Sequence, residues 1–224
     1  MILDGVLDQL HADLDRFAVL YLSGITLSLF DDDQRRRLFA LCEEARGHDL
    51  SVAFDTNHRS RCWPSATAAR HAYDQMAGIA DTVMPSWEDC QAVYADADPQ
   101  AAAQRFARRG AQTVVIKQGA RGAGIHVDGR WREVPGMPVD RPVDTSAAGD
   151  SFNAGFLAAR RAGATVDAAA AAGNRLAAVV IGHRGAIVPR ADFRAPDLGD
   201  LIPSDPPKNN RATSPSDHDA DPTS

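Results

Sequence analysis

The sequence lacks the features that would place it in a membrane, secreted or disulfide-rich class. No apolar run approaches the roughly 20 residues that a membrane-spanning helix requires. The start, MILDGVLDQLHADLDRF, is acidic and lacks the basic segment that opens a signal peptide. The three cysteines are an odd number without the spacing of a zinc site. These absences predict a cytoplasmic chain with reduced thiols and no membrane partner.

Excess positive charge is also absent. The formal net charge is -6 and the sequence pI is near 5.6, which argues against nucleic acid as a partner. The histidines are scattered, so no protein metal site is expected. No G-x-G-x-x-G follows the first expected strand, which makes a Rossmann oxidoreductase a poor interpretation. The hydrophobic fraction of 44% instead fits one soluble globular domain.

Short apolar runs alternate with helical patterns through most of the chain. Runs of this kind, buried on both faces and separated by helices, predict an α/β fold with a mostly parallel sheet covered on both sides. Asp128-Gly129 lies inside an alternating stretch and indicates a hairpin. We expect strands over 17–25, 51–57, 82–86 and 113–119, helices over 31–48, 66–80, 99–110, 150–162 and 167–181, and the hairpin over 123–134.

Polar residues follow the expected strands at the point where each one ends. In open parallel sheets, ligands bind at the carboxyl ends of the strands. The sequence therefore predicts a site built from four polar clusters: Ser23-Gly24, Asp55-Thr56-Asn57, Pro85-Ser86 and Lys117-Gln118-Gly119.

The end of the chain has a different composition. From Pro203 the sequence has almost no apolar residue and is rich in Pro, Ser, Asp and Asn. Such a segment buries too little surface to offset its ordering entropy. We expect one folded domain over 1–200 and a disordered tail over 203–224.

The stretch DTSAAGDSFNAGF (144–156) places small residues, Ala147-Ala148-Gly149, before a helix expected to begin near Asp150. The first N–H groups of a helix have no internal partner, so a phosphate can approach them where side chains are small. Asp150 would then suit a base that takes the proton of an alcohol during phosphoryl transfer. On this stretch alone, a helix-capping role for Asp150 is an equally good interpretation.

The same stretch resembles the second signature of ribokinase-like (PfkB-type) carbohydrate kinases, whose usual form is Asp-Thr-x-Gly-Ala-Gly-Asp. Ala147 stands where most members have glycine, as is typical of the 2-keto-3-deoxygluconate kinase branch. The resemblance implies a three-layer αβα fold and the cofactors ATP and Mg²⁺. It also implies an anion hole formed by Ala147, Ala148, Gly149 and Asp150, with Asp150 as the catalytic base in contact with the substrate.

Two further segments carry the resemblance on the sugar side. FDTNHRSRCW (54–63) is similar to the family's Phe-Asp-x-Asn-x-Arg-x-x-Leu-Trp, which implies that Asn57 and Arg59 bind the sugar acid. Without that resemblance, Arg59 would be taken as a solvated loop residue. In MPSWEDC (84–90), Ser86 and Asp89 stand where the family often has Asn-x-x-Glu, although a surface helix start is the better interpretation.

Two segments carry it on the nucleotide side. VIKQGARGAGI (115–125) resembles the strand and turn beside ATP, which implies contacts from Lys117, Gly119 and Gly122. AAAAAGNRLAAVVIGHRGA (168–186) resembles the helix and loop at the adenine pocket, which implies a contact from Asn174.

The resemblance runs from about residue 17 to 190 and covers about the carboxyl-terminal two-thirds of a family member. The family's amino-terminal strands and β lid are absent from this sequence, so we expect an exposed apolar sheet edge. It implies an ATP-dependent kinase for 2-keto-3-deoxygluconate, weak or inactive unless a partner chain completes the sugar site. A fructokinase-like kinase and a non-catalytic nucleotide-binding remnant stay open, as do a homodimer and a dependence on monovalent cations.

Overall fold

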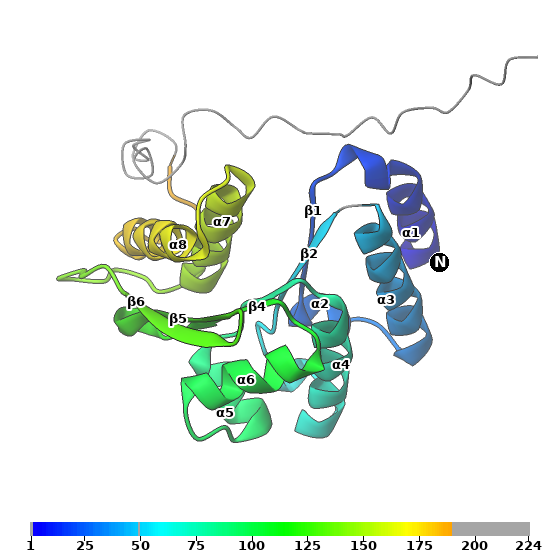
Figure 1. The fold of residues 1–224 in the computed structure, drawn as a ribbon, viewed down its shortest axis with the longest axis horizontal. Helices are drawn as coiled ribbons and strands as arrows, with labels where there is room; N and C mark the ends of the chain where they lie inside the picture. Colours follow the sequence, from blue (N-terminus) through cyan, green and yellow to red (C-terminus); the bar gives the residue numbers. More distant parts are fainter. Residues whose placement is uncertain (1, 49, 190–224) are drawn as a thin grey trace, which may run out of the picture.

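The computed structural model describes residues 2–48 and 50–189, where a six-stranded sheet lies between two groups of helices (Figure 1). The tail expected over 203–224 lies outside the described residues, as does the last part of the domain expected over 1–200. The strands are β1 (Val19–Ser23), β2 (Ser51–Asp55), β3 (Thr82–Val83), β4 (Thr113–Lys117), β5 (Gly122–Val127) and β6 (Arg130–Pro135). The helices are α1 (Ile2–Asp13), α2 (Gly24–Ser28), α3 (Asp32–Gly47), α4 (Ala66–Ile79), α5 (Trp87–Tyr94), α6 (Pro99–Arg109), α7 (Ala148–Arg161) and α8 (Val166–Ile181), with short 3₁₀ turns at Leu14–Arg16, Ser60–Cys62 and Gly119–Arg121.

Every strand and helix expected from the periodicity is present, with differences at element ends. The 12-residue helix α1 and the short helix α2 were not expected. The loop expected at Ser23-Gly24 is wrong, because α2 begins directly at Gly24. Helix α5 begins at Trp87, with the Ser86 hydroxyl accepting the Asp89 N–H at 3.1 Å. This confirms the interpretation of MPSWEDC as a helix start.

Most of the longer helices begin where a side chain caps their free N–H groups. Asp31 accepts the N–H of Gln34 at 2.9 Å, and the Gln34 side chain accepts the N–H of Asp31 at 3.0 Å, which forms a capping box. Helix α7 differs, because its N-cap Ala147 has no side chain able to cap. The other helices that begin on a capping side chain are α4, α5, α6 and α8, at Ser65, Ser86, Asp98 and Thr165.

The sheet follows the sequence order β1-β2-β3-β4-β5-β6. Strands β1 to β4 pair with one another in parallel, whereas β5 is antiparallel to both of its neighbours, β4 and β6. The β5–β6 turn at Asp128 (φ 51°) and Gly129 (φ 71°) has both residues at positive φ, as a two-residue hairpin requires. The mostly parallel sheet and the hairpin are both confirmed.

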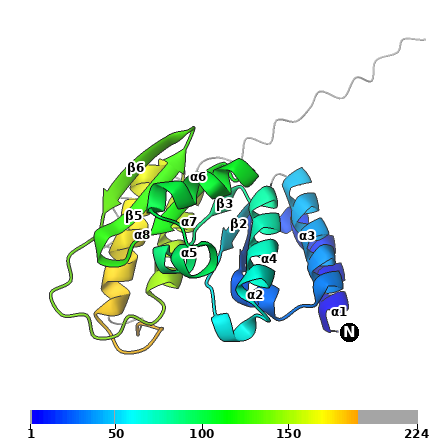
Figure 2. The same ribbon diagram turned by 90° about the horizontal axis from the view of Figure 1, so that it is seen from below.

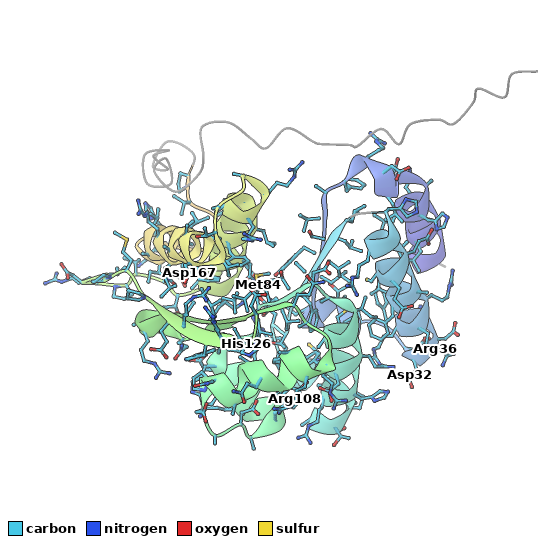
Figure 3. All side chains as sticks on the ribbon, viewed as in Figure 1. Asp32, Arg36, Met84, Arg108, His126 and Asp167 are labelled. Atoms are coloured by element: carbon cyan, nitrogen blue, oxygen red, sulfur yellow. The ribbon has the colours of Figure 1, made fainter. Side chains whose placement is uncertain are left out.

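The sheet separates two hydrophobic cores, which gives the expected three layers. One core places Phe152 and Phe156 of α7 against Met84, Val115 and Ile125, and Met84 lies between the sheet and α7 (Figure 3). The other core is formed with α3, α4 and α6 on the opposite face (Figure 2). Helix α7 is thus held on the sheet by its apolar face.

Strand β1 forms one edge of the sheet, and its only strand partner among the described residues is β2. Phe17 is 53% exposed and Tyr21 is 39% exposed. A cleft of about 740 Å³ lies between the strands and α7, lined by Val19 and Phe156 together with polar residues such as Asp81. The expectation of an exposed apolar edge is confirmed.

Two sequence expectations can be compared with the described residues: one concerns membrane-spanning helices and the other concerns the thiols. Within residues 2–48 and 50–189, no helix has both the length and the apolar character needed to cross a membrane. All three cysteines are free thiols: Cys42 and Cys90 are buried and Cys62 is exposed. Burial raises the pKa of the Cys42 thiol to about 12, which leaves it in the unreactive thiol form.

Candidate active site

The polar strand ends meet at one edge of the sheet, as the sequence predicts. Ser23 at the end of β1 pairs in register with Asp55 at the end of β2. The Lys117 Nζ at the end of β4 lies 2.7 Å from the Asp55 Oδ2, and a bridge joins Ser86 to Lys117. A charged, largely buried cluster therefore lies below the beginning of α7.

Helix α7 begins at Ala148, two residues before the expected start near Asp150, so Ala148 and Gly149 are inside its first turn. Ala147 precedes it with φ 58°. In the described part of the chain, the N–H groups of Gly149 and Asp150 have no hydrogen-bond acceptor. A Cβ at Gly149 would lie 3.4 Å from the Lys117 Nζ. The free N–H groups of Gly149 and Asp150, the small side chains at 147–149 and the nearby Lys117 ammonium form a cradle suited to a phosphate.

The Asp144 carboxylate holds the loop that enters this cradle. It accepts the Ser146 N–H at Oδ1 (2.8 Å) and the Gly185 N–H at Oδ2 (2.9 Å). The bond from the Ser146 backbone, followed by the other hydrogen bonds, lowers the pKa of Asp144. Asp144 thereby ties the start of α7 to the segment after α8.

We expect Asp144→Asn to destabilise the chain at neutral pH, because an amide offers one acceptor oxygen where two are used. A lowered pKa in the folded state means that the stabilisation is present above the unfolded pKa and is lost as pH falls through the folded pKa. The difference in urea midpoint from wild type should therefore shrink between about pH 5 and pH 2. Asp140→Asn, at an exposed position, is the control. A difference equal at both ends of that range would contradict the role of Asp144.

Asp150 is exposed in the first turn of α7, and its Oδ1 accepts the Asn57 Nδ2 at 3.4 Å. The Asn57 backbone has φ 32° and donates its N–H to the Asp55 Oδ1 at 3.1 Å. The interpretation of Asp150 as a helix cap is wrong, because Ala147 occupies the N-cap and no side chain caps the helix. The Asp150 carboxylate is instead accessible beside the cradle.

Arg59 lies at the edge of this group and is exposed; its Nη1 donates to the His58 carbonyl at 2.9 Å. Asp89 has a structural task, since its Oδ2 accepts the Thr56 hydroxyl at 2.6 Å and the His58 N–H at 3.1 Å. Burial lowers the pKa of His58. The loop that carries Asn57 is thus fixed from α5.

The residues predicted to bind the nucleotide do not all lie together. Lys117 is buried in the cluster under the cradle, whereas Gly119 is exposed with φ 59°. Gly122 is buried, and Asn174 lies nearby, with its Nδ2 donating to the carbonyls of Val134 (3.4 Å) and Pro135 (3.0 Å). The structure thus gives Asn174 a role in joining α8 to β6, while its contact with adenine stays a prediction.

Sequence reasoning missed two members of the cluster, Asn153 and Tyr21. The Asn153 Nδ2 donates to the Asp55 Oδ2 at 2.6 Å and to the Tyr21 hydroxyl at 3.1 Å. Burial, with the Asp55 charge as the second cause, raises the pKa of Tyr21. Asn153 could have been noticed as a polar residue in the apolar face that Phe152 and Phe156 form on α7.

Among the described residues, no group of three or more His, Cys, Asp or Glu side chains could hold a metal ion. Asp55 and Asp89 are already engaged by protein donors. Mg²⁺ in nucleotide sites keeps water ligands and needs only one or two carboxylates besides the phosphates. A metal at this site would therefore be held mainly by the phosphates of the nucleotide and by water.

Known proteins resemble this chain in sequence and in fold. A family profile described as "pfkB family carbohydrate kinase" matches residues 4–192. The chain is 36% identical over 181 residues to the 2-dehydro-3-deoxygluconokinase of Escherichia coli strain K12, covering 80% of this chain and 59% of that protein. The chain therefore spans about three-fifths of the length of this curated relative.

Solved structures share the fold. The Vibrio cholerae O395 fructokinase, in a form with fructose, ADP and calcium ion bound, matches with a TM-score of 0.69 and 25% identity, over 83% of this chain and 60% of that chain. An Escherichia coli putative ribokinase II in complex with ATP and Mg²⁺ matches with a TM-score of 0.70 and 22% identity, over 86% of this chain and 60% of that chain. The second likeness concerns the fold alone.

Proposed function

The chain belongs to the pfkB family of carbohydrate kinases, and on that premise we propose that it transfers the γ-phosphoryl group of ATP to a primary hydroxyl of 2-keto-3-deoxygluconate. The single observation that carries the proposal is the Asp150 carboxylate, exposed beside the free N–H groups of Gly149 and Asp150. An acceptor for an alcohol proton and a binding place for a phosphate are the two parts that such a transfer needs.

Each part of the cradle has one chemical task. The sugar hydroxyl oxygen bonds to the γ-phosphorus, the bond from that phosphorus to the ADP oxygen breaks, and Asp150 takes the hydroxyl proton. The N–H groups of Gly149 and Asp150 hold the transferring group, and Asn57 orients the Asp150 carboxylate from 3.4 Å. Mg²⁺ bound with ATP neutralises phosphate charge.

The substrate rests on two observations. Ala147 at the start of the cradle and the FDTNHRSRCW segment match the sugar-acid branch, and the relative from Escherichia coli is named a 2-dehydro-3-deoxygluconokinase. Asn57 and Arg59 are proposed to face the sugar acid, and Gly119, Gly122 and Asn174 the nucleotide. A fructokinase-like specificity is the alternative, supported by the likeness to the Vibrio cholerae enzyme.

The test is ATP-dependent phosphorylation of 2-keto-3-deoxygluconate by the purified chain, with Mg²⁺ present and ATP binding followed by calorimetry. Product formation that exceeds formation with fructose or without an acceptor supports both the activity and the substrate. Equal turnover with fructose would replace the substrate, and absence of both turnover and ATP binding would overturn the proposal.

A second candidate is a nucleotide-binding chain that does not transfer phosphate. The edge position of β1, whose only strand partner among the described residues is β2, favours it. ATP binding without turnover is the result expected for this candidate. A homodimer and a cytoplasmic location stay predictions from the sequence.

A further inference from the structure

Lys117 is held by two elements that are far from it in the sequence. Its Nζ donates to the Asp55 Oδ2 of β2 at 2.7 Å and to the Asn153 Oδ1 of α7 at 3.2 Å. Lys117 is 8% exposed, and Asp55 and Asn153 are each 2% exposed. The chain has lysine only at positions 117 and 208, and arginine serves as the basic residue elsewhere.

The chemistry of this position suits lysine. An ammonium is a compact charge with three donors, whereas a guanidinium is a wide planar fork. Space above the ammonium is limited, because a Cβ on Gly149 would approach the Nζ to 3.4 Å. Two of the three donors are already committed to Asp55 and Asn153.

The Asp55 carboxylate connects this ion pair to the cradle. Its Oδ2 accepts from Lys117 and from the Asn153 Nδ2 at 2.6 Å, and its Oδ1 accepts the Asn57 N–H at 3.1 Å. Asn57 in turn contacts Asp150. A buried carboxylate keeps its charge only with such partners, and removing one partner is strongly destabilising.

We propose that Lys117 is a positioning residue: by neutralising Asp55 and holding Asn153, it fixes the first turn of α7 above the strand ends. The free N–H groups of Gly149 and Asp150, and the Asp150 carboxylate, then keep their places. This differs from the direct nucleotide contact that the family resemblance implies for Lys117. The consequence for catalysis rests on the proposed function, whereas the placement of α7 does not.

The first test is hydrogen–deuterium exchange of the full chain in the variants Lys117→Met and Asn153→Ala. We expect amides of residues 148–156 to exchange at least about tenfold faster in both variants, because local opening of this turn becomes easier. Peptides from β5, β6 and α8 should accelerate less than residues 148–156, because a general loss of stability alone would accelerate all of them alike.

The matched control is Arg132→Met. Arg132 forms a bidentate pair with Asp167, with both bonds at 2.8 Å, and this pair joins β6 to α8 away from the cradle. It should leave exchange of residues 148–156 at the wild-type rate. If Lys117→Met does not fold, Asn153→Ala decides, and wild-type exchange in that variant would overturn the proposal.

The second test is a double-mutant cycle in unfolding. Lys117→Met should raise the unfolding equilibrium constant by about a hundredfold or more, since it leaves the buried Asp55 carboxylate without its ion-pair partner. With Asp55→Asn added, the combined effect should fall short of the product of the two single effects by about tenfold or more. Multiplicative effects would show that the pair does not act as a unit and would overturn the proposal.

Calorimetry with ADP separates positioning from direct contact. Weaker ADP binding in Lys117→Met with unchanged exchange of residues 148–156 would make Lys117 a phosphate ligand and overturn the proposal. If the wild-type chain binds no nucleotide, the proposed function fails. The exchange and unfolding measurements would then still decide whether Lys117 places α7.

Discussion

Asp150→Asn should lower the rate of phosphoryl transfer by about 10²- to 10⁴-fold, the contribution expected of a general base. The amide keeps the shape of the side chain and can still contact Asn57, but it cannot take the hydroxyl proton. ATP affinity should not fall, because the N–H groups of Gly149 and Asp150 are untouched by the change. Initial rates at saturating sugar acid, with ATP binding measured in parallel, check both expectations.

Asp167→Asn is the matched control for that experiment. Asp167 also lies in the first turn of a helix, but it pairs with Arg132 at the far end of the sheet from Asp150. Its replacement should leave transfer near the wild-type rate. Activity that survives Asp150→Asn would show that another group accepts the proton and would remove the central residue of the proposed mechanism.

The largest effect on stability is expected from Gly122→Ala, which should lower the free energy of unfolding by about 3 kcal/mol or more. Gly122 has φ 99°, and a Cβ there would lie 2.2 Å from the Val134 carbonyl oxygen and 2.3 Å from the Gly136 nitrogen. Both neighbours are backbone atoms, so they cannot move aside as a side chain would. Urea unfolding at neutral pH measures the loss.

Gly119→Ala separates crowding from backbone strain. Gly119 has φ 59°, but no atom lies within 4 Å of a Cβ placed there. We expect a loss of only about 1 kcal/mol, the strain of a left-handed conformation alone. Equal losses in the two variants would contradict the role given to the contact between β5 and β6. A large loss in Gly122→Ala and a small loss in Gly119→Ala would explain glycine at position 122 by the packing of β5 on β6, without reference to a nucleotide.

The sequence by itself determined the elements and their class. Apolar periodicity gave strands and helices of the right kind, because the 3.6-residue and two-residue repeats are local properties. Asp128-Gly129 specified its hairpin through positive φ at both positions. The small residues at 147–149 and the exposed acid at 150 marked the candidate site, since free amides at a helix start depend on few neighbours.

The tertiary structure alone decided which distant residues meet. Asn153 reaches Asp55 across 98 positions and Tyr21 across 132 positions, and neither contact follows from a local repeat. Lys117 could have been an exposed residue at a strand end, but strand order and register place it beside Asp55 and below α7. Pairings of this kind depend on how the sheet and the helices pack, so the contacts that hold Asp150 in place are seen only in the tertiary structure.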